Sequence, residues 1–150
     1  MASISNNEIK KIKALQQKKF RDETGLFVVE GDKIVEEALR SSFAVESHYR
    51  RDEIGEEAMK RMSSLSSPSP SLAVVRKPSD VYPDDYKEIS DSLSGGGLYL
   101  ALDSIRDPGN LGTVIRSALA FGIDEVILSD DCADIYNEKT IRASMGCLFS

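Results

Sequence analysis

The sequence predicts an α/β protein. Short apolar runs rich in β-branched residues alternate with segments whose apolar residues recur at helical spacing, in both halves of the chain. Hydrophobic residues make up 41% of the 150 positions, which is enough to form a packed core. Strands that alternate with helices are typical of parallel sheets covered by helices, so we expect parallel α/β layers in both halves.

The elements of the first half follow from apolar spacing and from turn residues. A polar residue among positions 5–7 can cap a helix whose apolar residues recur every three positions and which ends near Phe20. Residues 26–29 have the composition of a buried strand, and Gly31 precedes a second helix. We further predict a strand over 43–49, a helix over 52–62 and a strand over 72–75.

Residues 77–96 have prolines, acids and a triple glycine but no sustained apolar period, which is typical of a linker. We therefore predict one domain over residues 1–76 and another over 97–150.

The second domain opens with the alternating residues Leu98, Leu100 and Leu102, which predict a strand. We further predict a helix over 111–121, a strand over 125–129, a helix capped by Asn137 and ended by Gly146, and a strand over 147–149. Because this half has only about fifty residues and stops where its third strand begins, the chain looks cut short.

Charge is distributed unevenly along the chain. The net charge is −6, which argues weakly against a nucleic-acid partner. Residues 8–21 are nevertheless basic, with Glu8 as their single acid. Their cationic residues are Lys10, Lys11, Lys13, Lys18, Lys19 and Arg21. This segment predicts either a nucleic-acid contact or the solvated face of a helix.

Several functional classes are disfavoured by the composition. The apolar runs are too short for a membrane span, and the N-terminus lacks the apolar core of a secretory signal, so we expect a cytoplasmic protein. Cys132, Cys147 and His48 have no metal-ligand spacing, and we expect no metal. The phosphate-loop and dinucleotide-binding glycine patterns are also missing, which disfavours nucleotide triphosphates and dinucleotides.

The stretch LDSIRDPGNLGTVIRSALAFG, residues 102–122, carries the strongest functional signal. Pro108 and Gly109 suit the centre of a type II turn, and Asn110 then falls at a helix N-cap. Gly112 has no side chain, so a ligand could approach the backbone where the first helical N–H groups are unpaired.

Arg116 lies early in this predicted helix, where the helix dipole disfavours a positive charge. Helical side chains lean toward the N-terminus, so the guanidinium can reach back over the loop toward a negative partner. That partner is either a phosphate or one of the loop carboxylates, Asp103 or Asp107. In the second case Arg116 would have a purely structural role.

At these residues the sequence resembles a known family. DSIRDPGNLGTVIRSALAFGIDEVILS resembles the first motif of the SpoU (TrmH-type) branch of the SPOUT RNA methyltransferases, and ADIYNEKTIRASMG resembles the segment that follows it. FRDETGLFVVEGDKIVEEAL is similar to the family's substrate-binding domain, a small α/β unit like RNA-binding ribosomal proteins. The resemblance implies a substrate-binding domain followed by the first part of an α/β-knot methyltransferase domain.

The resemblance implies transfer of a methyl group from S-adenosylmethionine to a ribose 2′-hydroxyl of rRNA or tRNA. It makes Arg116 the catalytic arginine and places Asn110 near the reaction centre. The RNA-binding residues would be Lys10, Lys11, Lys18, Lys19 and Arg21, with Arg142 either a further phosphate contact or a surface charge. The family's later motifs hold the cofactor and would lie mostly beyond Ser150, so we expect the 150-residue chain alone to be inactive and the complete protein to be a homodimer.

Two classes of function remain open. The first is an RNA 2′-O-methyltransferase, and the second is a non-catalytic RNA-binding protein that retains the fold. The proton acceptor in the first class is open as well. A guanidinium is a reluctant base, so we prefer a role for Arg116 in holding a phosphate and polarising the hydroxyl.

Overall fold

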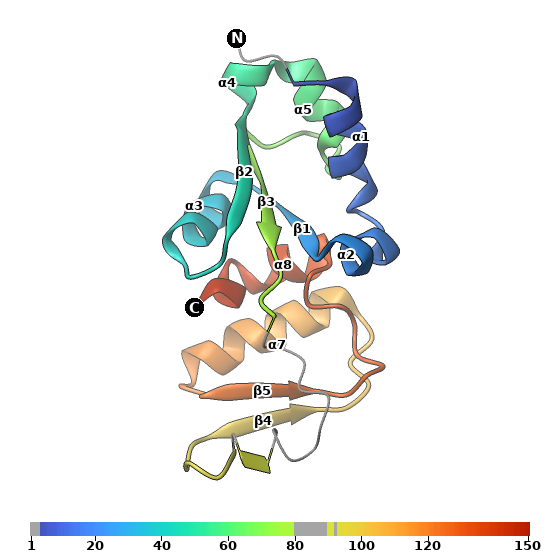
Figure 1. Cartoon of the computed structure of the whole chain (residues 1–150). Helices are drawn as coiled ribbons and strands as arrows, with labels where there is room; N and C mark the ends of the chain where they lie inside the picture. The colour runs from blue at the N-terminus through green and yellow to red at the C-terminus, as the bar shows by residue number, and fades with distance from the viewer. Residues whose placement is uncertain (1–3, 80–89, 92) are drawn as a thin grey trace.

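Figure 1 shows the computed structural model, which describes residues 4–79, 90, 91 and 93–150. In chain order its elements are α1 (Asn6–Ala14), α2 (Lys18–Thr24), β1 (Leu26–Glu30), α3 (Asp32–Arg40), β2 (Val45–Arg50), α4 (Arg51–Ile54), α5 (Glu56–Met62), β3 (Ser71–Arg76), β4 (Tyr99–Leu102), α7 (Pro108–Ala120), β5 (Glu125–Leu128), α8 (Glu138–Ser144) and the 3₁₀ helix η1 (Cys147–Phe149). Residues 80–89 and 92 of the predicted linker 77–96 lie outside the described residues.

The first sheet has the strand order β1-β3-β2, and β3 is antiparallel to both neighbours. The expectation of a parallel sheet in the first half is therefore wrong. β1 and β2 do run in the same direction, as a helical crossover predicts, but β3 pairs between them. The chain returns to the end of the sheet where β2 finished, because Arg50 is opposite Ser71 in the register.

Two predicted helices are each interrupted in the structure. The first is divided into α1, which ends at Ala14, and α2, which begins at Lys18. The buried side chain of Arg21 donates hydrogen bonds to the carbonyl oxygens of Leu15 and Gln16 at this break. The helix predicted over 52–62 is divided at Gly55, whose φ of +91° is outside the helical region. Glycine adopts this left-handed conformation readily, whereas apolar spacing alone does not reveal it.

Helices cover both faces of the first sheet. Ile9 and Ile12 of α1 and Met62 of α5 pack with Val28 and Val74 on one face. The other face is covered by α3 and by α8, which comes from the second half of the chain. Its core consists of Phe27, Val29, Val35, Ala38, Ala73, Val75, Tyr136 and Ile141. One hydrophobic core therefore contains residues from both halves.

The second sheet consists of β4 and β5, which are parallel as predicted, with Tyr99 opposite Glu125. The strand predicted over 147–149 is instead η1. Met145 and Gly146 both have left-handed backbone angles that turn the chain before it. Phe149 then packs on the rings of Phe27 and Phe43, with centroid distances of 6.3 and 5.0 Å.

In Figure 1, α8 lies between the first sheet and α7, so it connects the two halves of the molecule. No helix among the described residues is long and apolar enough to cross a membrane. The described residues also contain no group of three or more His, Cys, Asp and Glu side chains suited to a metal ion. His48 instead forms a 2.7 Å hydrogen bond between its Nε2 and the Oγ of Ser71.

Candidate functional site

The candidate site is at the carboxyl ends of β4 and β5, where α7 begins. Asp107 is the N-cap of α7, and its Oδ1 accepts a 2.8 Å hydrogen bond from the backbone N–H of Asn110. The sequence-based expectation of a type II turn at Pro108 and Gly109, with Asn110 as the cap, is wrong. Pro108 occupies the first helical turn, where its missing N–H costs no hydrogen bond and its φ is already suitable.

Asn110 and Arg116 are both exposed on α7. The helix begins at Pro108, so Arg116 lies in its second half, and the prediction that Arg116 lies early in the helix, against the dipole, is wrong. The Arg116 side chain makes no hydrogen bond or ion pair with any residue that the structure describes. The two loop carboxylates have other neighbours: Asp107 accepts a hydrogen bond from the Asn110 N–H and lies 3.9 Å from Lys139 Nζ, and Asp103 Oδ1 lies 3.4 Å from Ser104 Oγ. The structure therefore does not contain the intramolecular ion pair that would give Arg116 a purely structural role.

Gly112 is buried against α8 and does not face a ligand. A Cβ at this position would overlap the Thr140 carbonyl oxygen and lie 2.6 Å from the Ala143 Cβ. The expectation that Gly112 admits a ligand is therefore corrected, because the space beside it is filled by the neighbouring helix. This close approach joins the helix that carries Arg116 directly to α8.

Lys139 is a candidate site residue that the sequence reasoning missed. It lies in the first turn of α8, with its side chain mostly exposed, and its Nζ is 3.9 Å from Asp107 Oδ2. Its side chain also borders Gly109 in the first turn of α7. The only sequence signal is its place two residues after the N-cap Asn137, and the packing of α7 on α8 brings it to the site.

A network centred on Asp131 joins the loops that follow β4 and β5. The Asp131 carboxylate accepts hydrogen bonds from Ser104 at 2.7 Å, Ser129 at 2.8 Å and Arg106 at 2.9 Å. These bonds, with that from Ser104 the largest contribution, hold the pKa of the Asp131 carboxyl well below its usual range. The carboxylate therefore stays ionised at neutral pH.

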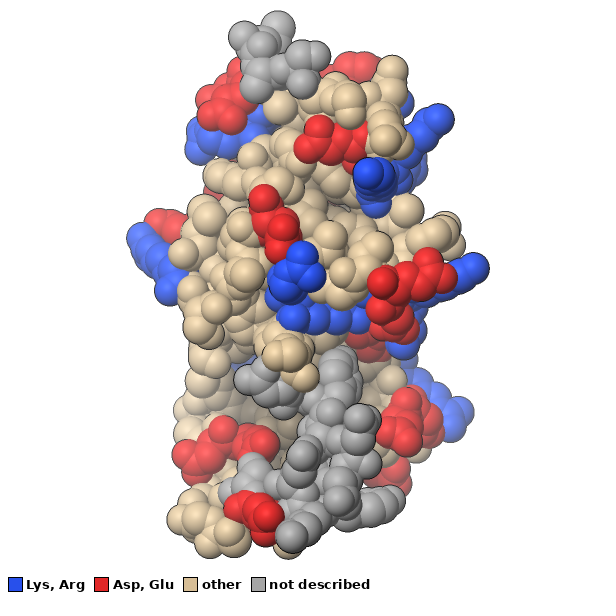
Figure 2. Space-filling view, viewed as in Figure 1, with Lys and Arg blue, Asp and Glu red and all other residues tan. Residues whose placement is uncertain are grey.

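The lysines of the basic segment are exposed, but their surroundings differ. The side chains of Lys10 and Lys11 make no hydrogen bond or ion pair with a described residue, whereas Lys18 Nζ lies 2.6 Å from the Asp22 carboxylate and Lys19 Nζ lies 3.9 Å from the Glu23 carboxylate. Lys13, which is also exposed, resembles Lys10 and Lys11 in lacking a described partner. Figure 2 shows basic side chains interspersed with acidic ones on this view of the molecule, not one continuous positive surface.

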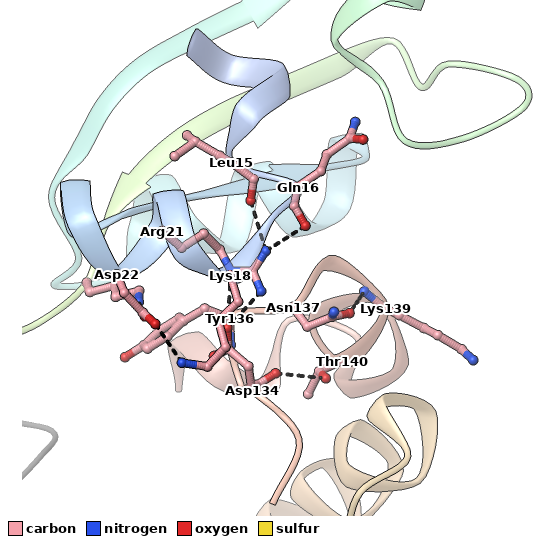
Figure 3. Close-up of polar contacts among 11 residues, drawn as sticks. Leu15, Gln16, Lys18, Arg21, Asp22, Asp134, Tyr136, Asn137, Lys139 and Thr140 are labelled. Atoms are coloured by element: carbon pink, nitrogen blue, oxygen red, sulfur yellow. Dashed lines mark hydrogen bonds and ion pairs between the residues drawn. The ribbon is translucent and has the colours of Figure 1, made fainter. Parts of the chain in front are cut away.

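Arg21 belongs to the interior. Only 2% of its side chain is exposed, and its guanidinium binds the Asp134 carboxylate at 2.8 Å and the carbonyl oxygens of Leu15 and Gln16 at 2.9 Å (Figure 3). The prediction that Arg21 binds RNA is therefore corrected. The Asp134 loop lies 113 positions along the chain, so local charge spacing does not reveal this partner.

Arg142 is half-buried and faces the first half of the chain. Its Nη1 donates a 3.3 Å hydrogen bond to Ser64 Oγ and lies 3.8 Å from Glu138 Oε2. Glu138 is itself largely buried, and burial raises the pKa of its carboxyl. Arg142 therefore helps join the two halves, and its contact with RNA stays a prediction.

Comparisons with known proteins find two family matches, one in each half of the chain. Residues 6–91 match the MRM3-like substrate binding domain, and residues 97–150 match the SpoU rRNA Methylase family. The 23S rRNA (guanosine(2553)-2'-O)-methyltransferase RlmP of Bacillus subtilis is 33% identical over 98% of this chain and 61% of its own length.

Solved structures give the same result. A TrmH-family protein from Porphyromonas gingivalis is 33% identical, with a TM-score of 0.82 over 98% of this chain and 61% of its own. The AdoMet-bound rRNA methyltransferase from Sinorhizobium meliloti is 30% identical, with a TM-score of 0.81 over 99% of this chain and 62% of its own.

The chain thus spans about three fifths of the length of these relatives. Both of its halves match domains of the same group of enzymes, in the same order. The chain belongs to the SpoU (TrmH-type) methylase family, with an MRM3-like substrate-binding domain over residues 6–91 before the SpoU segment over residues 97–150.

Proposed function

We propose that the whole protein transfers a methyl group from S-adenosylmethionine to a ribose 2′-hydroxyl of rRNA or tRNA. The observation that carries this proposal is the exposed side chain of Asn110 in the first turn of α7, at the carboxyl edge of a parallel sheet, which is where open α/β sheets bind ligands. Arg116 is exposed further along the same helix, and its side chain has no partner among the described residues. The names of the relatives support the reaction: one is a 23S rRNA guanosine 2'-O-methyltransferase, and one was solved with AdoMet bound.

The described residues do not by themselves form a site for S-adenosylmethionine. The space beside Gly112, where the sequence suggested that a ligand approaches the backbone, is filled by α8. Asn110 and the first turn of α7 offer one exposed side, whereas a small-molecule site usually encloses most of its ligand. We therefore assign no residue of this chain to the cofactor and derive only what the chain contributes to the RNA.

Arg116 is proposed to hold the RNA and polarise the reacting hydroxyl. A guanidinium presents its N–H donors in a fixed fork that suits a phosphate, and it keeps its charge at any physiological pH. It therefore orients the nucleotide and stabilises negative charge that develops on the 2′-oxygen, while the proton leaves to a phosphate or to water. Lys139 adds positive charge near the first turn of α7, where Asn110 lies.

Lys10, Lys11, Lys18 and Lys19 are proposed as the RNA-binding residues of the first domain. Their exposure and the match to a substrate-binding domain support this role. Lys10 and Lys11 have no acidic partner among the described residues, so we expect them to contribute more than Lys18 and Lys19, whose charges are partly neutralised by Asp22 and Glu23.

Three further expectations remain proposals. We keep the division into residues 1–76, 77–96 and 97–150. The two separate family matches support two domains and the start of the second at residue 97, whereas the first match runs to residue 91, within the proposed linker. A homodimer is proposed from the family resemblance, and sedimentation of the whole protein tests it. A cytoplasmic location is proposed from the similarity to a Bacillus subtilis protein. Other relatives are mitochondrial, so the location of a tagged whole protein in the cell is the test.

Replacement of Arg116 tests the proposed catalytic role. In the whole protein, Arg116→Ala should slow single-turnover methyl transfer by about a hundredfold or more, since a positioned catalytic group contributes about 10²–10⁴-fold. Arg116→Lys should also fail, because an ammonium does not reproduce the guanidinium fork. Arg40→Ala is the matched control, because Arg40 is an exposed arginine of α3 that pairs with Glu36. Near-normal transfer by Arg116→Ala would contradict the assignment, and a wild type that binds RNA without transfer would favour the non-catalytic alternative.

Glutamine substitutions test the RNA surface. Replacing Lys10 and Lys11 should weaken binding to unrelated RNAs and reduce the slope of log affinity against log salt by about 0.7–0.9 for each lost phosphate contact. The same change at Lys18 and Lys19 should have a smaller effect. Unchanged affinity and slope for all four substitutions would identify this segment as a solvated helix face.

A further inference from the structure

The loop between β4 and α7 contains an unfavourable backbone conformation. Ser104 has a φ of +57°, in the left-handed region that residues other than glycine rarely adopt. Such a residue persists only where its surroundings hold it, and it is often found at functional sites. Ser104 lies three residues before Asp107, which starts the helix that carries Asn110 and Arg116.

Contacts with the loop after β5 hold Ser104 in this conformation. Its backbone N–H donates to Ser129 Oγ at 2.9 Å, and its hydroxyl donates to Asp131 Oδ2 at 2.7 Å. Asp131 also accepts a hydrogen bond from Ser129, so the two groups that bind Ser104 are joined to each other at 2.8 Å. A hydrogen bond between backbone groups, from the Ala133 N–H to the Ile105 carbonyl oxygen at 2.8 Å, holds the next residue of the loop.

The same carboxylate fixes a second point of the loop. Arg106 donates from Nη2 to Asp131 Oδ2 at 2.9 Å, directly before the N-cap Asp107. A single exposed ion pair contributes little, but here one carboxylate accepts from three side chains of two loops at the same edge of the sheet. Asp131 therefore defines the path of the chain from β4 into α7.

We propose that Asp131 is a positioning residue, which holds Ser104 and Arg106 so that α7 presents Asn110 and Arg116 in their working geometry. The proposal rests on the proposed function, because Asp131 acts only through the roles assigned to Asn110 and Arg116. It assigns no contact with RNA or the methyl donor to Asp131 itself. A misplacement of about 1 Å can lower the rate of a reaction about a hundredfold, so a loosened loop should affect the chemical step.

Asp131→Asn in the whole protein tests this role. The amide keeps the size of the side chain but removes the charge and places an N–H₂ group where an acceptor is needed. We expect the single-turnover rate at saturating RNA to fall about tenfold to a hundredfold, with the dissociation constant for RNA changed less than twofold. Exchange of the Ser104 amide hydrogen should become faster. Asp130→Asn is the matched control, because Asp130 is the adjacent exposed aspartate and its side chain makes no hydrogen bond or ion pair with Ser104 or Arg106.

Two results would overturn the inference while the wild type remains active. An unchanged transfer rate in Asp131→Asn would show that the network is not needed for the reaction. A loss of rate accompanied by an equal loss of RNA affinity, or by unfolding, would show that Asp131 acts in binding or in stability instead. If the wild type itself transfers no methyl group, the proposed function and this inference both fail.

Discussion

Replacement of Arg21 should cost more stability than any exposed arginine of the chain. The Arg21 side chain is 2% exposed, and Asp134, which it contacts at 2.8 Å, is 9% exposed. Arg21→Met keeps a long, unbranched side chain but removes the charge and all donors. The Asp134 carboxylate and the carbonyl oxygens of Leu15 and Gln16 then lose a partner inside the fold.

The magnitude follows from the burial of this pair. Removing one partner of a buried ion pair costs about 3–5 kcal/mol, because the other charge is left uncompensated. A buried acceptor without a donor costs about 1–3 kcal/mol, although these contributions overlap and do not add. We therefore expect Arg21→Met to lower the free energy of unfolding by at least about 3 kcal/mol, and Arg21→Met with Asp134→Leu to recover part of it.

Urea unfolding measures this difference, with Arg76→Met as the control. Arg76 contacts Glu46 at 2.7 Å, but the two side chains are 51% and 41% exposed, so its loss should cost less than about 1 kcal/mol. If Arg21→Met loses no more stability than Arg76→Met, Arg21 does not join the two halves of the chain as described.

Two other substitutions probe the contact between the halves. Gly112→Ala should lower the unfolding midpoint, because the new Cβ would overlap the Thr140 carbonyl oxygen. Overpacking destabilises a core by about 1–3 kcal/mol, which exceeds the gain in helix propensity of about 1 kcal/mol. Gly95→Ala, at a position with open space around it, should leave the midpoint unchanged. An unchanged midpoint in thermal unfolding would mean that α7 and α8 are less closely packed than described. Burial raises the pKa of the Glu138 carboxyl above its value of 4.5, so folding favours the protonated form, and the stabilisation is present below that pH and is lost as pH rises through the folded-state pKa. Glu138→Gln should flatten this pH dependence in denaturant unfolding, the exposed Glu57→Gln should not, and equal profiles would contradict the assignment.

Local features of the fold could be predicted from the sequence, whereas long-range features could not. Apolar spacing located the strands of both halves, and Asn137 is the helix cap that its residue type predicts. The order of the strands in the sheet could not be predicted, because the alternation of strands and helices does not show that β3 pairs between β1 and β2. The prediction of a strand at residues 147–149 was wrong for a similar reason, since Phe149 packs on aromatic rings that are distant in the sequence.

The candidate site shows the same division. Asn110 and Arg116 are both exposed on α7, and the sequence predicts the helix that carries them. Arg21 looked like part of a basic surface, but its carboxylate partner is contributed by the other half of the chain. Lys139 and Asp131 reach the site only through the packing of separate loops and helices, so no local pattern identifies them.

The position of the transferred methyl group tests the central claim most directly. The whole protein is incubated with tritiated S-adenosylmethionine and ribosomal RNA, and the RNA is digested to nucleosides and separated. The proposed function predicts tritium in a 2′-O-methylated nucleoside and, for Arg116→Ala, about a hundredfold less of it in a single turnover. Tritium in a base-methylated nucleoside, or none in RNA that the wild-type protein binds, would contradict the claim.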